Sequence, residues 1–168
     1  MQLIVFILIY PLLWIVSHLP FRFLYVISDI LYFLLYHIFK YRKKTVIENL
    51  TLVFPEKTEM ERNRIMKAFY HHLCDMILEA IKSMNIKIDD MKERFKFTNI
   101  DLIKKYEKEN KSISLMCAHY GSWEWIFILQ AYTTHQTFAI YKRLNNKYFD
   151  KLFRKIRARY NSYLITTK

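Results

Sequence analysis

A histidine and a glutamate separated by four residues are the side chains of this sequence best suited to catalysis. They lie in the stretch His119-Tyr-Gly-Ser-Trp-Glu124. An imidazole held by a carboxylate can take the proton of a hydroxyl group, whose oxygen can then attack an acyl carbon. The spacing therefore predicts that His119 is a general base and that Glu124 orients it. The alternative is that the two residues only end a strand and begin a helix.

The elements around this pair are expected to form a strand-to-helix junction. The apolar run Ser112–Ala118 predicts a buried strand that ends just before His119, and a helix should follow with Ser122 as its N-cap. Glu124 then falls in the first helical turn, where the helix dipole favours a carboxylate. Gly121, the only glycine of the chain, is expected where the backbone needs a positive φ or a close approach. Sites in open α/β sheets commonly lie at such junctions.

The order of expected helices and strands from Thr58 onward predicts an α/β fold. An amphipathic helix opens with the capping box Thr58-Glu-Met-Glu61 and ends near Asn85. Further strands and helices then alternate, which is typical of a sheet flanked by helices. The expected strands are 94–98, 112–118, 137–141 and one that begins at 163, and the expected helices are 99–109, 122–132 and 147–160. We therefore expect N-terminal membrane-associated helices followed by a mixed sheet flanked by helices.

Three polar residues recur at intervals of four in the long amphipathic helix. His71, Asp75 and Glu79 therefore share one face. Such a trio could ligate a metal, but no Cys or His cluster elsewhere in the sequence would complete the site. We interpret the face as a polar helix surface and expect no metal.

Composition favours a chain that works at a membrane. Of the 168 residues, 53% are hydrophobic and 17% aromatic, and the net charge is +12. This charge would also suit nucleic acid binding, but no base-reading or stacking motif accompanies it. With one glycine, a dinucleotide-binding fingerprint is excluded. The two cysteines, Cys74 and Cys117, lie in apolar segments and indicate no disulfide framework, which fits a reducing, cytosol-facing location.

The first forty residues are expected to anchor the protein. The segments 3–16 and 23–39 are apolar, and Pro11, Pro20 and Arg22 are expected to break what would otherwise be one long segment. No basic start or cleavage site marks a removable signal peptide. A basic cluster of Lys40, Arg42, Lys43 and Lys44 follows directly and should stay on the cytoplasmic side. We thus divide the chain into a membrane-anchoring segment, 1–40, and an α/β domain, 41–168; the alternative is a helical hairpin buried in a soluble core.

At His119–Trp125 the sequence resembles the His-x4-Glu/Asp signature of bacterial lipid A late acyltransferases, within the lysophospholipid acyltransferase superfamily. The segment Tyr41–Pro55 is similar to an upstream block of that family, with Tyr-Arg, Asn-Leu and Phe-Pro in the same order. The segment Tyr141–Arg159 resembles a downstream block that ends in Arg-x-Arg, although Lys142-Arg143 departs from the usual Arg-Pro. Blocks that family members carry beyond Arg-x-Arg are missing, so we expect an N-terminal part of a longer enzyme.

The resemblance implies an acyltransferase-like fold and an enzyme that moves a fatty acyl chain to a hydroxyl of a lipid A precursor. The donor would be an acyl carrier protein that brings its own phosphopantetheine thioester, so no separate cofactor or metal is expected. His119 and Glu124 would be catalytic. The residues expected to bind substrate are Arg157, Arg159, Gly121 and Tyr141. The location implied is the bacterial inner membrane, with the catalytic part on the cytoplasmic face.

Two other interpretations stay open at this point. The acceptor could be a lysophospholipid, an aminolipid or another membrane lipid. Whether the donor is an acyl carrier protein or acyl coenzyme A is also left open. Alternatively, the chain is a non-enzymatic basic module that binds anionic membranes or nucleic acid. The identity of the acceptor, the acyl chain length and the oligomeric state are not defined by the sequence.

Overall fold

The computed structural model describes residues 1–167, which form two compact units. One unit comprises Leu19–Ile81, and the other comprises Met1–His18 together with the chain from Lys82 onward. The expected division into a membrane-anchoring segment, 1–40, and a domain, 41–168, stays a prediction.

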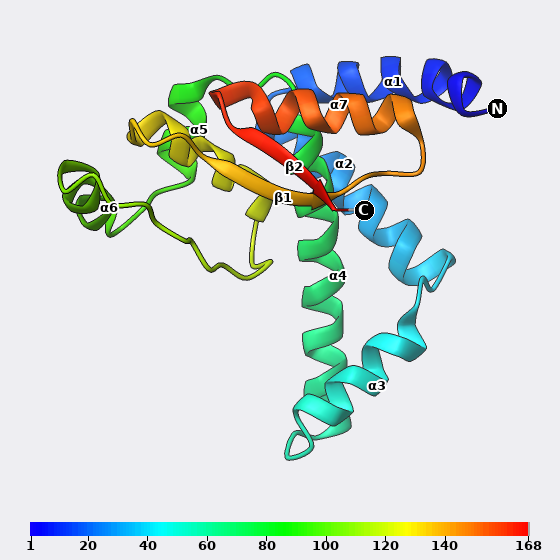
Figure 1. The fold of residues 1–168 in the computed structure, drawn as a ribbon. Coiled ribbons are helices and arrows are strands. Elements are labelled where there is room, and N and C mark those ends of the chain that lie inside the picture. Colours follow the sequence, from blue (N-terminus) through cyan, green and yellow to red (C-terminus); the bar gives the residue numbers. More distant parts are fainter. Residues whose placement is uncertain (168) are drawn as a thin grey trace. The chain divides into compact units, whose positions relative to one another are not determined.

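The unit Leu19–Ile81 is helical throughout. Helix α2, Phe21–Phe33, continues without a break into the π-helical turn η1, Leu34–Ile38, and is followed by α3, Lys43–Val53. The long helix α4, Glu59–Lys82, completes this part of the chain (Figure 1). The core of this unit consists of Tyr36, Met66 and Tyr70, and apolar side chains of α3 and α4 pack against it.

The predicted start of α4 is confirmed. The Thr58 backbone N–H donates to Glu61 Oε2 at 2.8 Å, and the Glu61 N–H donates to Thr58 Oγ1 at 3.3 Å. These two bonds form the reciprocal capping box, which satisfies backbone donors that the helix itself leaves unpaired. The hydrogen bonds from Thr58 also lower the pKa of the Glu61 carboxyl below its ordinary value.

In the other unit, helix α1, Gln2–His18, lies beside α7, Lys147–Arg157 (Figure 1). The ring of Phe6 on α1 contacts the ring of Phe149 on α7, with 5.2 Å between centroids. Asn146 caps α7, because its side chain accepts from the backbone N–H groups of Tyr148 and Phe149. The remaining helices of this unit are α5, Ile88–Arg94; α6, Ile100–Lys108; the 3₁₀ helix η2, Trp123–Tyr132; and the 3₁₀ turn η3, Ala158–Tyr160.

Two of the predicted strands are present and pair in parallel. Strand β1, Phe138–Lys142, lies next to β2, Tyr163–Thr167, in a register that opposes Phe138 to Tyr163. Helix α7 connects them, as expected for a parallel pair. The α/β class therefore holds in a helix-rich form, with a small parallel sheet in place of the larger mixed sheet that we expected.

Two predicted strands are wrong. Helix α5 extends to Arg94, and the Phe95 N–H bonds to the Met91 carbonyl, so the start of segment 94–98 belongs to a helix end. Segment 112–118 is exposed and has no regular structure. An apolar run becomes a strand only where a neighbouring strand accepts its backbone hydrogen bonds, and the described part of the chain pairs none with it.

The apolar N-terminal segments are both helices. Residues Phe21–Ile38 form one helix that is long and apolar enough to cross a membrane. Helix α1 is apolar but shorter, and Pro11 lies inside it, so the expected interruption at this proline is wrong. Pro20 does separate α1 from α2.

Candidate active site

Glu124 and Arg157 form a bidentate ion pair between η2 and α7. Arg157 Nε donates to Glu124 Oε2 at 2.9 Å, and Arg157 Nη2 donates to Glu124 Oε1. The two side chains are only 14% and 12% exposed, so little water screens their charges. A planar guanidinium matches a carboxylate through two parallel bonds, which fixes the orientation of both groups.

Four aromatic rings surround the Arg157 guanidinium. Its central carbon lies 5.6 to 5.9 Å from the centroids of Trp123, Phe127, Tyr141 and Phe153. Phe153 precedes Arg157 by four residues on α7 and therefore shares its face. The rings attract the cation and keep water from the ion pair, which strengthens it.

His119 lies outside this pair but close to it. It is exposed at the end of segment 112–118, and its ring contacts the Trp123 indole with 4.3 Å between the centroids. Within residues 1–167 it makes no hydrogen bond to Glu124, whose two carboxylate oxygens are both bound by Arg157. The structure thus brings together Glu124, Arg157 and Tyr141, and places His119 on the Trp123 side of the cluster.

Gly121 shapes the turn between His119 and η2. Its φ is +59°, so the predicted need for a positive φ is confirmed. A Cβ atom at this position would meet no other atom within 4 Å, so backbone conformation rather than space requires the glycine. Ser122 occupies the N-cap position of η2, but its side chain makes no capping hydrogen bond.

Two contacts to Ser83 anchor the elements of the site. The indole N–H of Trp125 donates to Ser83 Oγ at 2.9 Å, and Arg159 Nη1 donates to the Ser83 carbonyl at 3.1 Å. Nearby, the Tyr160 hydroxyl bonds to Met91 Sδ at 3.3 Å, and burial raises the pKa of this phenol. Arg159 therefore braces the end of α7, and a role for it in substrate binding stays a prediction.

Tyr141 contributes a second polar group to the cluster. Its side chain is 9% exposed, and among the described residues its buried hydroxyl has no hydrogen-bond partner. An unpaired buried hydroxyl costs free energy unless a ligand or water satisfies it. This is compatible with the predicted substrate contact.

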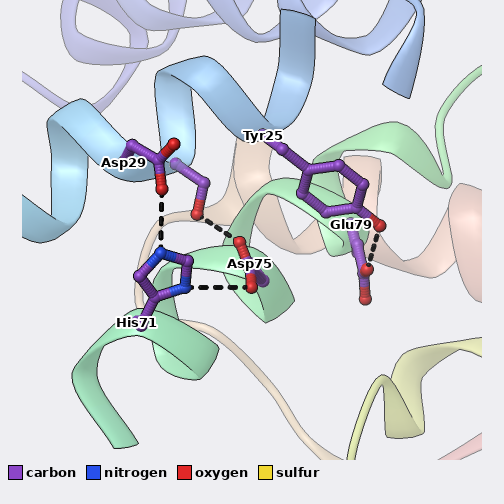
Figure 2. A network of polar contacts seen from close by, with 6 residues as sticks. Tyr25, Asp29, His71, Asp75 and Glu79 are labelled. Carbon is purple, nitrogen blue, oxygen red and sulfur yellow. Dashed lines mark hydrogen bonds and ion pairs between the residues drawn. The ribbon is translucent and has the colours of Figure 1, made fainter. Parts of the chain in front are cut away.

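The polar face of α4 packs against α2 (Figure 2). His71 Nε2 lies 2.8 Å from Asp29 Oδ1, Ser28 donates to Asp75 at 2.6 Å, and Tyr25 donates to Glu79 at 2.8 Å. The polar face is therefore bonded to a neighbouring helix. No group of three His, Cys, Asp or Glu side chains suited to a metal ion occurs among residues 1–167.

Sequence reasoning missed the rings around Arg157. Trp123 and Phe127 are spaced four residues apart, and Trp123 stands within the motif itself, directly before Glu124. Their apolar character suggested only core packing. The sequence signal for this arrangement was the spacing of Phe153 and Arg157, because an aromatic residue and an arginine four residues apart share one face of a helix.

The family model for the bacterial lipid A biosynthesis acyltransferases matches residues 1–168. The chain belongs to this family. The resemblance drawn from the three sequence blocks is thereby confirmed. No match was found among curated proteins or among solved structures.

Membership in the lipid A acyltransferase family assigns the chain to the acyltransferase class, with an acyl donor and a lipid acceptor as substrates in general. The apolar helix Phe21–Ile38 is consistent with the membrane association typical of the family.

Proposed function

We propose that this protein transfers a fatty acyl chain from the thioester of an acyl carrier protein to a hydroxyl group of a lipid A precursor. The observation that carries the proposal is the family match over the whole chain, which includes the His-x4-Glu motif. The net charge of +12 supports it further, because the carrier is acidic and the acceptor is phosphorylated.

In the proposed reaction, His119 takes the proton of the acceptor hydroxyl while its oxygen attacks the thioester carbon. The carbon–sulfur bond breaks, and the departing thiolate receives the proton from the imidazolium. Glu124 orients the imidazole and stabilises its positive charge, while Arg157 holds Glu124 in place. His119 lies on an exposed segment without regular structure, so a movement of this segment toward Glu124 would complete the dyad.

We further propose that the reaction takes place at the inner membrane, with the site on the cytoplasmic face. Helix α2 and η1 together supply the apolar segment. The cluster Lys40, Arg42, Lys43 and Lys44 follows at its end, and such clusters remain on the cytoplasmic side and attract anionic lipid heads.

The donor and the acceptor are tested with the purified protein in detergent micelles. Labelled acyl carrier protein or labelled acyl coenzyme A is offered with a lipid A precursor, a lysophospholipid or an aminolipid. We expect label to move from the carrier protein to the lipid A precursor. Transfer only to another lipid would change the acceptor, and transfer only from coenzyme A would change the donor.

The mechanism is tested by substitution of the proposed base. His119→Ala should lower kcat by about 10²–10⁴-fold, the usual loss on removal of a general base. Glu124→Gln should also cause a large loss, and the double variant should lose much less than the product of the two, since the residues act as a unit. His72→Ala, which removes an exposed histidine of α4, is the matched control and should retain activity. Wild-type turnover by a folded His119→Ala protein would end this mechanism.

A further inference from the structure

We propose that Trp123 is a positioning residue that holds the His119 imidazole beside the Glu124–Arg157 pair. This role rests on the proposed function of His119 as the general base. It extends that function to a residue that was not among the predicted site residues.

The indole of Trp123 connects the two halves of the site. On one side, the His119 ring lies against it with 4.3 Å between centroids and an interplanar angle of 52°. The central carbon of the Arg157 guanidinium lies 5.6 Å from the centroid of the same Trp123 ring, and this guanidinium binds Glu124. One ring therefore contacts both the predicted base and the group that holds its predicted partner.

His119 depends on this contact more than the other histidine that packs on a tryptophan. His18 on α1 lies 4.2 Å from the Trp14 ring, but its Nδ1 also bonds to the Trp14 carbonyl at 2.8 Å. His119 is exposed and makes no hydrogen bond within residues 1–167. The Trp123 ring is thus the contact that restricts the orientation of this imidazole.

Trp123 is itself held by a fixed element. It begins η2, and its backbone N–H donates to the Gly121 carbonyl at 2.8 Å. Two residues later the buried Trp125 attaches the same helix to Ser83. A large flat ring on an anchored helix can hold an exposed imidazole, whereas a small aliphatic side chain at the same place cannot.

The contact is tested first without any assay of activity. A histidine ring that lies against an indole quenches its fluorescence, so His119→Gln should raise the Trp123 emission at constant pH. The measurement uses the full chain in detergent with Trp14→Phe, which removes the other indole that lies on a histidine. The emission of Trp125 is common to the two proteins that are compared. If His119→Gln leaves the emission unchanged, Trp123 does not contact His119 and the inference is wrong.

The positioning role is then tested by kinetics. Trp123→Leu should lower kcat by about 10- to 100-fold, because small misplacements of a reacting group carry losses of this order. The Michaelis constants for donor and acceptor should change little, and the acid limb of the pH–rate profile should shift, because the environment of the base has changed. Trp123→Phe keeps a flat ring and should restore most of the rate.

The two proposals fail in different ways. If the wild-type protein transfers no acyl chain under any condition, the proposed function fails, and the fluorescence comparison with His119→Gln still decides whether Trp123 contacts His119. If Trp123→Leu is folded by circular dichroism and keeps the wild-type kcat and pH profile, the positioning role is wrong while the acyltransferase activity stands. A loss that Trp123→Phe does not restore, with an unchanged pH profile, would indicate a purely structural role and would also overturn the inference.

Discussion

Glu124 and Arg157 are charged groups that most water does not reach. Each is less than 15% exposed, and each would lose the free energy of hydration without the other. The aromatic rings around Arg157 add a favourable cation–π term but cannot replace a carboxylate. The pair therefore has a structural role before any catalytic one, and a change in activity after mutation has to be separated from a change in folding.

We expect Arg157→Ala to lower the free energy of unfolding by about 3 kcal/mol, at the lower end for buried pairs because both side chains keep some exposure. Glu124→Gln in the same protein should recover part of this loss, since it removes the uncompensated charge. Denaturant unfolding of the wild type, both single variants and the double variant gives the coupling energy. Strictly additive changes would show that the two charges do not interact.

Arg157→Lys separates the two roles of this arginine. The lysine keeps the charge but loses the planar fork, so Glu124 should be held less rigidly. If Arg157 also contacts an anionic group of the substrate, the Michaelis constant should rise more than kcat falls in this folded variant. An unchanged Michaelis constant would leave Arg157 with the single task of holding Glu124.

Among the elements, α4 has a start that local hydrogen bonds define. Its capping box consists of local bonds between Thr58 and Glu61, which do not depend on the rest of the fold. The site elements differ from it. The 3₁₀ helix η2 and the turn before it are held by distant contacts such as the one between Trp125 and Ser83.

Thr58→Ala should therefore cost about 1 kcal/mol of stability, the usual loss at an N-cap threonine.

The stabilisation that the Glu61 carboxylate gives to the capping box should depend on pH. The pKa of the Glu61 carboxyl is lowered in the folded protein. Its contribution to the free energy of unfolding is therefore present at pH values above its ordinary pKa of 4.5, and it is lost as the pH falls through the lower pKa of the folded protein. Unfolding curves at pH 7 and pH 3 check this, and Glu61→Gln should be less sensitive to acid in this range. An effect of Thr58→Ala that grows on acidification would contradict the argument.

At the scale of the whole molecule, the chain combines a net charge of +12 with exposed apolar helices. Large side chains of α1 and α2 such as Leu8, Phe23 and Phe33 are more than half exposed. Exposed apolar surface of this extent marks a site of contact with lipid or protein. With the span Phe21–Ile38, a lipid bilayer is the environment that we propose for it.

The protein should accordingly stay with membranes at high salt. Salt screens the attraction between basic side chains and lipid phosphates but does not weaken apolar burial. We expect the full chain to remain in the membrane pellet after a 1 M salt wash (~3 Å Debye length) and to enter the supernatant in mild detergent. Release of most of the protein by salt alone would show that charge, rather than apolar insertion, holds it.

Local sequence patterns were sufficient for features whose cause is local. The helix from Thr58, the helix that begins after Asn146 and the positive φ of Gly121 follow from capping, periodicity and the lack of a side chain, each within a few residues. The motif also indicated the family, because it depends on the order of residue types alone.

Features that depend on partners far along the chain were decided by the tertiary structure. Glu124 bonds to Arg157, thirty-three positions away, because α7 passes η2 in the fold. Segment 112–118 has the composition of a strand but remains unpaired, since a strand forms only where another strand offers hydrogen bonds. The sequence shows that helix α1 is apolar, but only the fold shows that it packs on α7, because its aromatic side chains meet those of a helix that is more than 120 residues distant.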